Sequence, residues 1–247
     1  MLLHGLTATH RYVVMGSRAL ERAGCAAIAY DARGHGASDP APEPSAYEYA
    51  DLAADLARVM DDHGIDRAVL AGASMGAHTL LRFALDHPER AAGLVVITPA
   101  FEPDGERDFA RWDALSDGLR SGGVEGFVAA YGEPDVPEQW RETVLRVIRQ
   151  RLAAHEHPEA VADAIRATPR SRPFPTIESL AAIDAPTVVV ADRDDADPGH
   201  PLAVGERYAE VIPGATLRVE EEGKSPLAWQ GSQLSKIIAE VAEEAVV

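Results

Sequence analysis

Gly72-Ala73-Ser74-Met75-Gly76 is the stretch of sequence that decides the fold class of this chain. The apolar run Ala68–Ala71 precedes it, and a helix-forming run over residues 77–87 follows it. A G-x-S-x-G pentapeptide between a strand and a helix is typical of a sharp turn that holds the serine in a strained backbone conformation with its hydroxyl exposed. Since the helix begins at this turn, its free N–H groups point at whatever Ser74 attacks. The context predicts a nucleophilic serine.

Composition limits the classes of function that the chain can serve. Its 247 residues fit one domain with an insertion, and 46% apolar residues are normal for a globular core. A net charge of −17 argues against binding to nucleic acid and to anionic membrane surfaces. The sequence has no apolar stretch of membrane-spanning length and no signal peptide. We therefore expect a small-molecule partner.

Cys25 is the only cysteine, so an intramolecular disulfide is impossible. This fits a reducing compartment, and we expect the cytoplasm. Cys25 itself falls in an apolar run, which favours a packing role over a reactive one.

Apolar runs alternate with helical patterns along most of the chain. Strands are predicted near residues 1–4, 25–30, 67–72, 92–98, 186–191 and 215–220. Helices are predicted near residues 12–23, 46–63, 75–87, 201–211 and 231–245. The strands are apolar throughout, as in a parallel sheet that is covered on both faces. The pattern predicts an α/β fold with a doubly wound, mostly parallel sheet.

Residues 100–175 interrupt this alternation, because they contain helix-forming pieces and no good strand. We interpret this segment as a helical cap insertion over the edge of the sheet. The core is then formed by residues 1–99 and 176–247. Caps commonly form the lid and much of the substrate pocket.

His4-Gly5-Leu6-Thr7 follows the first predicted strand. A glycine at this place lets the backbone turn so that a following N–H faces the top of the sheet. Together with the N–H after the nucleophile, it would form a two-donor oxyanion hole. We assign the two donors to Leu6 and Met75.

A glycine-rich loop, Tyr30–Asp39, follows the second predicted strand and contains His35. His35 is flanked by two glycines and precedes Ser74 in the chain, so we favour a structural role for it over that of a base. With this loop, the chain resembles the α/β-hydrolase superfamily of serine esterases and lipases. His4-Gly5 resembles the oxyanion motif of that superfamily, Tyr30–Asp39 the loop after its fourth strand, and Gly72–Gly76 its nucleophile elbow.

The resemblance covers nearly the whole chain but departs from the family at the N-terminus. Family members usually have an antiparallel hairpin of two strands before the His-Gly strand. Here these N-terminal strands are missing, so we expect an exposed edge of the sheet.

The resemblance also implies an acid after the strand that follows the cap, in a pattern like G-x-x-D-x-x-x-P. The region reads Val190-Ala-Asp-Arg-Asp-Asp-Ala-Asp-Pro198. Counting back from Pro198 assigns the acid to Asp194. Asp192, Asp195 and Asp197 are the competing carboxylates.

The family's base is a histidine after the last strand, but Lys224 stands there and no histidine follows His200. Three glutamates precede Lys224 and favour its ammonium form, which cannot accept a proton. His200 is the alternative base, because it follows Asp194 closely. His155 and His157 in the cap are further candidates, and an enzyme with no base would be nearly inert.

These residues predict a serine hydrolase of the carboxylesterase type that acts on a small ester or related acyl bond. Ser74 would attack, Leu6 and Met75 would hold the oxyanion, and Asp194 would orient or charge-balance the base. We expect no cofactor and no metal, because neither a phosphate loop nor a third metal ligand at a recognised spacing is present. Two alternatives stay open: a catalytically impaired protein that binds a small ligand, and a C–C hydrolase or lyase on the same scaffold.

Overall fold

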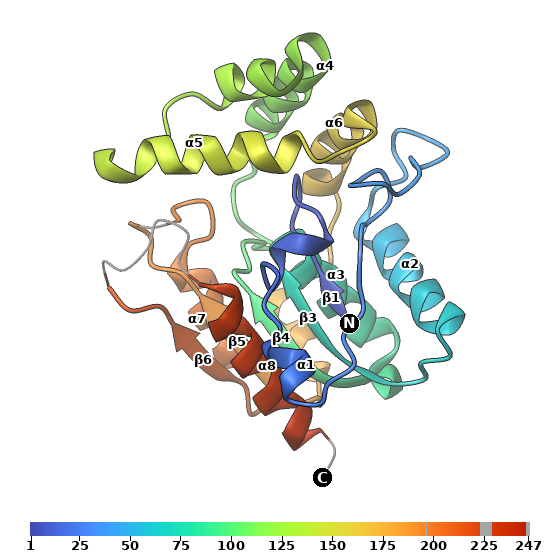
Figure 1. Cartoon of the computed structure of the whole chain (residues 1–247). Coiled ribbons are helices and arrows are strands. Elements are labelled where there is room, and N and C mark those ends of the chain that lie inside the picture. Colours follow the sequence, from blue (N-terminus) through green and yellow to red (C-terminus); the bar gives the residue numbers. More distant parts are fainter. Residues whose placement is uncertain (196, 223–228, 246–247) are drawn as a thin grey trace.

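The computed structural model describes residues 1–195, 197–222 and 229–245 (Figure 1). Its centre is a six-stranded sheet in which every pair of neighbouring strands is parallel, in the order β2-β1-β3-β4-β5-β6. The strands are β1 (Leu2–Leu3), β2 (Ala29–Tyr30), β3 (Ala68–Ala73), β4 (Ala91–Ile97), β5 (Thr187–Ala191) and β6 (Thr216–Val219). The predicted α/β fold with a parallel sheet is confirmed.

Helices cover both faces of this sheet. They are α1 (Ala19–Arg22), α2 (Tyr49–Asp62), α3 (Met75–Asp86), α7 (Leu202–Val211) and α8 (Gly231–Glu244), with short 3₁₀ turns η1 (His10–Tyr12), η2 (Pro88–Arg90), η3 (Thr168–Arg170) and η4 (Ile177–Ala182). Side chains of α1 and α8 pack on one face of the sheet, and those of α2, α3 and α7 pack on the other.

Alternate residues of each central strand serve these two layers. Leu94 and Val96 of β4 contact the larger core cluster, whereas Val95 and Ile97 contact the cluster under α8. This double burial explains why the strands are apolar at every position instead of every second one.

The segment between β1 and β2 differs from the single helix predicted over residues 12–23. It contains only η1 and the four-residue α1. Met15 and Gly16 separate the two, because both have positive φ angles, of 48° and 75°, which a right-handed helix cannot contain. The predicted strand at 25–30 is likewise reduced to Ala29–Tyr30.

Three helices lie above the carboxyl ends of the strands: α4 (Phe109–Tyr131), α5 (Glu138–Leu152) and α6 (Pro158–Ala167) (Figure 1). Gly123, with φ of 59°, kinks α4. A separate apolar cluster, which includes Leu115, Leu152 and Val161, holds the three helices together. They are the cap helices that the sequence predicts, and the cap boundaries at residues 100 and 175 stay a prediction.

Among the described residues, no helix has the length and apolar character that crossing a membrane requires.

Candidate active site

Ser74 occupies the turn between β3 and α3 with φ of 52° and ψ of −111°, a conformation that side-chain-bearing residues rarely adopt. The turn needs its two glycines. A Cβ atom at Gly72 would meet the backbone of Gly76 and lie 2.9 Å from the nitrogen of Ala77. A Cβ atom at Gly76 would meet the carbonyl of Leu3 and lie 2.8 Å from that of His4. The predicted strained turn is therefore present.

The hydroxyl of Ser74 lies 2.8 Å from Nε2 of His200. Nδ1 of the same ring lies 2.7 Å from a carboxylate oxygen of Asp197. Since the carboxylate can only accept, Nδ1 carries the proton and Nε2 is free to accept the serine proton. The structure thus joins a serine, a histidine and an aspartate in one chain of hydrogen bonds.

His200 and Asp197 come from one tight turn in the loop between β5 and α7. The N–H of His200 donates to the carbonyl of Asp197 at 3.0 Å, and Pro198 and Gly199 lie between them. Proline at the second position of a β-turn is favoured because its ring presets the φ angle that the turn needs. The turn brings the first and fourth side chains together, which explains how residues only three apart form the pair.

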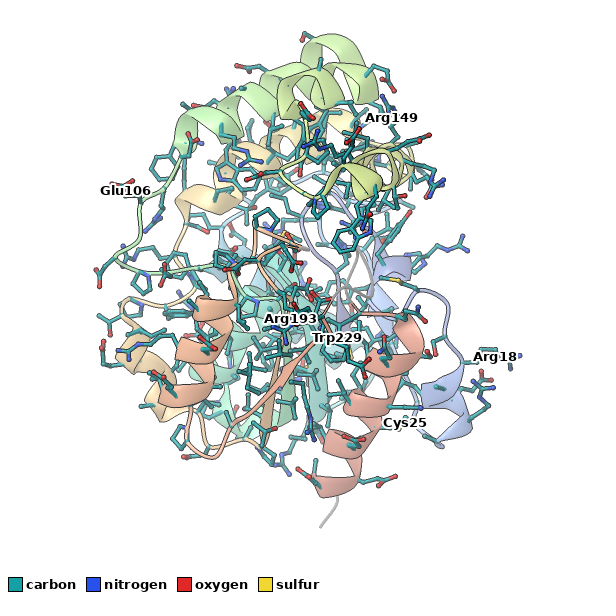
Figure 2. All side chains as sticks on the ribbon, turned by 90° about the vertical axis from the view of Figure 1, so that its left-hand side faces the viewer. Arg18, Cys25, Glu106, Arg149, Arg193 and Trp229 are labelled. Carbon is teal, nitrogen blue, oxygen red and sulfur yellow. The ribbon has the colours of Figure 1, made fainter. Side chains whose placement is uncertain are left out.

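Other side chains hold the same loop in place. A carboxylate oxygen of Asp194 accepts the N–H of Leu202, the first residue of α7, at 2.7 Å. Glu220, which follows β6, accepts the N–H of Arg193 at 2.8 Å, and the indole N–H of Trp229 donates to the carbonyl of Ala191 at 3.2 Å. Figure 2 labels Arg193 and Trp229, which both lie below the cap.

The electrostatics of the pair suit a base. Burial alone would lower the pKa of His200, but the charge and hydrogen bond of Asp197 outweigh it and raise the pKa above its ordinary value. Burial would raise the pKa of Asp197, but His200 and a backbone hydrogen bond from Gly199 lower it overall. The carboxylate therefore stays ionised. The side chains are 24% exposed for His200 and 36% for Asp197, so both remain accessible.

Asp192 is a further carboxylate beneath this pair. It is 5% exposed, and its Oδ1 has no hydrogen-bond partner in the described part of the chain. Burial, together with the charges of Asp197 and Glu220, raises the pKa of Asp192 to about 7.

The loop after β1 passes beside the elbow. A Cβ atom at Gly5 would lie 3.3 Å from the carbonyl oxygen of Ala73 and 3.4 Å from Cβ of Ser74. Within the described residues, the N–H groups of Leu6 and of Met75, the first residue of α3, have no hydrogen-bond acceptor. Two unpaired donors beside Ser74 have the chemistry of an oxyanion hole.

His155, between α5 and α6, ties this loop to the cap. Its Nδ1 accepts the N–H of Gly36 at 2.8 Å, so its Nε2 carries the proton and donates to the carbonyl of Thr7 at 3.0 Å. Thr7 has a positive φ of 67°. The tether therefore holds a strained residue directly after Leu6.

Two further histidines stiffen the same region from below. Nε2 of His4 accepts the N–H of Ala32 at 2.9 Å, and its Nδ1 lies 2.8 Å from the carbonyl of Gly5. His35 is fully buried, with ring centroids 5.1 Å from that of His4 and 5.5 Å from that of His155. Burial lowers the pKa of His4 to about 4 and that of His35 to about 3. This placement agrees with the structural role expected for His35.

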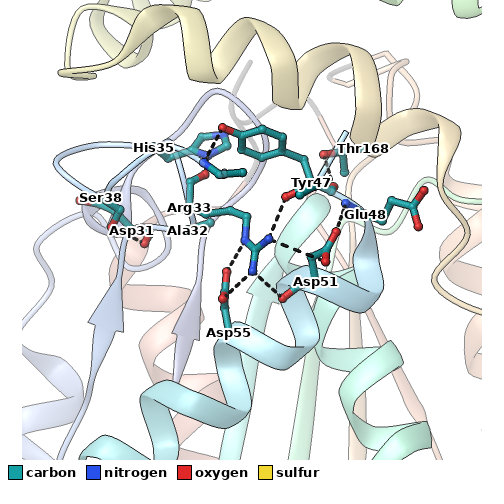
Figure 3. Close-up of polar contacts among 12 residues, drawn as sticks. Asp31, Ala32, Arg33, His35, Ser38, Tyr47, Glu48, Asp51, Asp55 and Thr168 are labelled. Atoms are coloured by element: carbon teal, nitrogen blue, oxygen red, sulfur yellow. Dashed lines mark hydrogen bonds and ion pairs between the residues drawn. The ribbon is translucent and has the colours of Figure 1, made fainter. Parts of the chain in front are cut away.

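Arg33 anchors the loop that carries His35 and Gly36 (Figure 3). Its guanidinium donates two hydrogen bonds to Asp55 of α2, at 2.6 and 2.7 Å, and a third to the carbonyl of Ala46 at 2.8 Å. A bidentate arginine–carboxylate pair fixes orientation as well as distance. The loop that receives His155 is therefore itself fastened to α2.

The structure brings together Ser74, Met75, Leu6 and His200 among the residues singled out in the sequence. It separates the four candidate acids: Asp197 contacts His200, Asp194 contacts the start of α7, Asp192 is buried and Asp195 is exposed. Lys224 lies outside the described residues. The Asp197–His200 pairing was not predicted, because the sequence Asp-Pro-Gly-His indicates a tight turn but not that the turn faces Ser74. No group of residues that could hold a metal ion occurs within the described ranges.

Comparisons with known proteins agree with this scaffold. The RutD protein of Variovorax paradoxus, whose name describes a carbamate hydrolase, is 33% identical over 207 residues, covering 83% of this chain and 76% of its own. The 2-hydroxy-6-oxononadienedioate/2-hydroxy-6-oxononatrienedioate hydrolase 2 of Pseudomonas putida is 31% identical, covering 80% and 69%.

Among solved structures, a thermophilic esterase from Thermogutta terrifontis is 24% identical with a TM-score of 0.78, covering 100% of this chain and 89% of its own. That likeness concerns the fold. The sequence model of the alpha/beta hydrolase fold family matches residues 1–231. The chain therefore belongs to the α/β-hydrolase fold family.

Proposed function

We propose that this protein hydrolyses an ester or a related acyl bond of a small molecule, with Ser74 as nucleophile, His200 as base and Asp197 as the acid that orients it. The observation that carries the proposal is the hydrogen-bonded chain from Ser74 Oγ to His200 at 2.8 Å and from His200 to Asp197 at 2.7 Å. Nucleophile, base and orienting group within hydrogen-bond reach are what acyl transfer requires.

The proposed reaction follows from the protons in this chain. His200 Nε2 takes the proton of Ser74 while Oγ bonds to the substrate carbonyl carbon, and Asp197 stabilises the imidazolium that forms. The N–H groups of Leu6 and Met75 donate to the oxyanion. His200 then protonates the leaving alcohol or amine. A water attacks the acyl-serine by the same steps in reverse, which releases the acid and restores Ser74.

The names of two relatives suggest which kinds of bond the protein could cleave. One is named for a carbamate and another for a 2-hydroxy-6-oxo dienedioate. A carbamate carbonyl presents the same target to Ser74 as an ester does, so carbamates belong with esters in a first substrate panel. Cys25 is a free thiol, which fits the cytoplasm that we propose as the compartment.

A fluorophosphonate probe tests the nucleophile, because it bonds only to an activated serine. We expect labelling of the wild type and none of Ser74→Ala. His200→Gln should label at least about a thousandfold more slowly, since it removes the base. Equal labelling of Ser74→Ala would sink the proposal. Failure of the folded wild type to label would favour the ligand-binding alternative.

The pH profile tests the base. His200 must be neutral to accept the serine proton, and its pKa is raised. Activity should therefore fall as pH falls, with a midpoint above the ordinary histidine value of 6.5. Because Asp197 causes the rise, Asp197→Asn should move the midpoint of residual kcat/KM to lower pH. An unmoved midpoint would mean that another group titrates.

A further inference from the structure

Arg151, the penultimate residue of α5, lies at the underside of the cap, and no carboxylate in the described part of the chain is within ion-pair distance of it. Its guanidinium carbon is 5.2 Å from the ring centroid of Tyr12, in the 3₁₀ turn η1 that follows the loop after β1 (the oxyanion loop, residues 4–7). Its Nε is buried, and it has no hydrogen-bond acceptor among the residues that the structure describes. Figure 1 shows α5 running across the top of the sheet, above the segment that follows β1.

Arginines at five cap positions pair with aspartate or glutamate in the described ranges: Arg120, Arg141, Arg149, Arg166 and Arg170. Four other arginines of the cap, like Arg151, lack a carboxylate partner in the described part of the chain, but Arg111, Arg146 and Arg172 are exposed to water and Arg107 donates to the carbonyl of Arg170. This chain carries 40 acidic residues, so carboxylates are plentiful. Removing a guanidinium from water without a compensating anion costs free energy. A buried arginine that lacks such an anion is poised for one from outside.

The charge of Arg151 acts on the proposed catalytic residues. It contributes to the lowered pKa of Asp197, and it disfavours protonation of His200. The charges of Arg151 and Asp197 also act on the pKa of Tyr131, at the end of α4: Arg151 lowers it and Asp197 raises it. The guanidinium therefore packs against Tyr12 and lies near enough to Asp197, His200 and Tyr131 for its charge to act on them.

We propose that Arg151 binds a carboxylate of the substrate, so that the preferred substrates are acyl compounds that carry an anionic group besides the bond that is cleaved. This inference rests on the proposed hydrolase function. A guanidinium presents N–H donors in a planar fork that matches a carboxylate. The whole chain has a net charge of −17 and repels anions, so a local cation would decide their binding.

Matched p-nitrophenyl esters test the proposal. The mono-p-nitrophenyl esters of succinate, glutarate and adipate carry a carboxylate, and the p-nitrophenyl esters of butyrate, pentanoate and hexanoate do not. We expect the wild type to prefer the anionic member of at least one pair in kcat/KM. Arg151→Met should reduce that preference by about 10- to 100-fold, as expected for one charged hydrogen-bonding group. Arg151→Lys should restore part of it.

Arg149→Gln is the matched control. Arg149 lies two residues away on the same helix, is 43% exposed and pairs with Glu125 at 2.7 Å. Figure 2 labels it in the cap. This variant should keep the wild-type preference. Arg151→Glu should reverse it, because repulsion replaces attraction.

Binding separates this inference from the proposed function. With Ser74→Ala, calorimetry of monomethyl glutarate should give a Kd that weakens at least about tenfold when Arg151→Met is added. Wild-type hydrolysis without a charge preference, or an equal loss on charged and neutral esters in Arg151→Met, overturns the inference and leaves the hydrolase intact. Absent hydrolysis overturns the proposed function, and the binding measurement then decides for or against Arg151. A Kd unaffected by Arg151→Met overturns the inference.

Discussion

The elbow around Ser74 and the loop that carries His200 meet at one hydrogen bond, yet they are held in different ways. The elbow is fixed by backbone atoms in contact, since Gly72 and Gly76 leave no room for a Cβ. The loop after β5 is fixed by side chains: Asp194 on Leu202, Glu220 on Arg193, and Asp197 on His200. Close backbone packing has one solution, whereas a loop fastened by side chains can be rebuilt with different residues.

This difference indicates which substitutions should change stability and which should change activity. A change in the elbow forces backbone atoms apart and acts first on folding. A change in the loop removes one hydrogen bond and acts first on chemistry or on one end of α7. Three substitutions test this separation, and a fourth, Asp192→Asn, tests the buried carboxyl at the base of the loop.

Asp197→Asn should have the largest effect. The amide cannot hold His200 in the proton arrangement that accepts from Ser74, so kcat for an ester should fall by about 10⁴-fold, as in other serine triads. Steady-state hydrolysis of a p-nitrophenyl ester measures it, and thermal unfolding should stay close to that of the wild type. Asp194→Asn, three residues earlier, is the control and should lower kcat by less than about tenfold. The reverse ranking would return the acid to Asp194.

Gly76→Ala should come next, with its effect on stability. The new methyl group would meet the carbonyls of Leu3 and His4, and relief requires movement of β1. We expect a loss of about 4 kcal/mol in the free energy of unfolding, measured by urea denaturation. Gly122→Ala in α4 is the control, because nothing lies near its Cβ position. That variant should gain about 0.5–1 kcal/mol from helix propensity. A Gly76→Ala protein as stable as the wild type would contradict the account of the elbow.

Asp192→Asn should stabilise the protein in a pH-dependent way. The pKa of Asp192 rises from 3.8 to about 7 on folding, so the folded state favours the protonated form. The cost of ionising it grows as pH rises from 3.8 to about 7 and is constant above that. The full pKa shift corresponds to about 4 kcal/mol in the free energy of unfolding. We expect Asp192→Asn to recover about half of this, because the carboxyl retains some solvation. The urea midpoints of wild type and variant should coincide near pH 4, and the variant should have the higher midpoint at pH 8. An equal rise in the midpoint at both pH values would exclude titration of Asp192 as the cause.

Asp194→Ala should have the smallest effect. It removes the acceptor of the first N–H of α7, which typically costs about 1 kcal/mol. Hydrogen exchange at Leu202 should accelerate while exchange in β4 is unchanged. Faster exchange throughout the sheet would show that the loop supports more than the start of α7.

The two regions also differ in how far the sequence predicts them. The elbow is predicted by Gly72, Ser74 and Gly76, because only glycine fits where two backbone segments touch. The sheet is predicted by its strands, because strands buried on both faces need apolar residues at every position. The pairing of Asp197 with His200 depends on a turn whose direction is set by contacts from Glu220 and from α7. Counting from Pro198 points to Asp194, but the proline belongs to the turn that carries Asp197 toward His200. The helix predicted over residues 12–23 is interrupted at Met15 and Gly16, whose positive φ angles the apolar pattern does not indicate.

The hydrogen bonds of His155 make the cap and the oxyanion loop one mechanical unit. The ring holds Gly36 with one nitrogen and Thr7 with the other, so a cap that lifts must break both bonds or pull Leu6 with it. The alignment of the proposed oxyanion donor, the N–H of Leu6, then depends on the position of the cap. In the proposed mechanism, a ligand that draws the cap down would also align the N–H of Leu6, and a protein with a raised cap would hold Ser74 without one of its two proposed oxyanion donors.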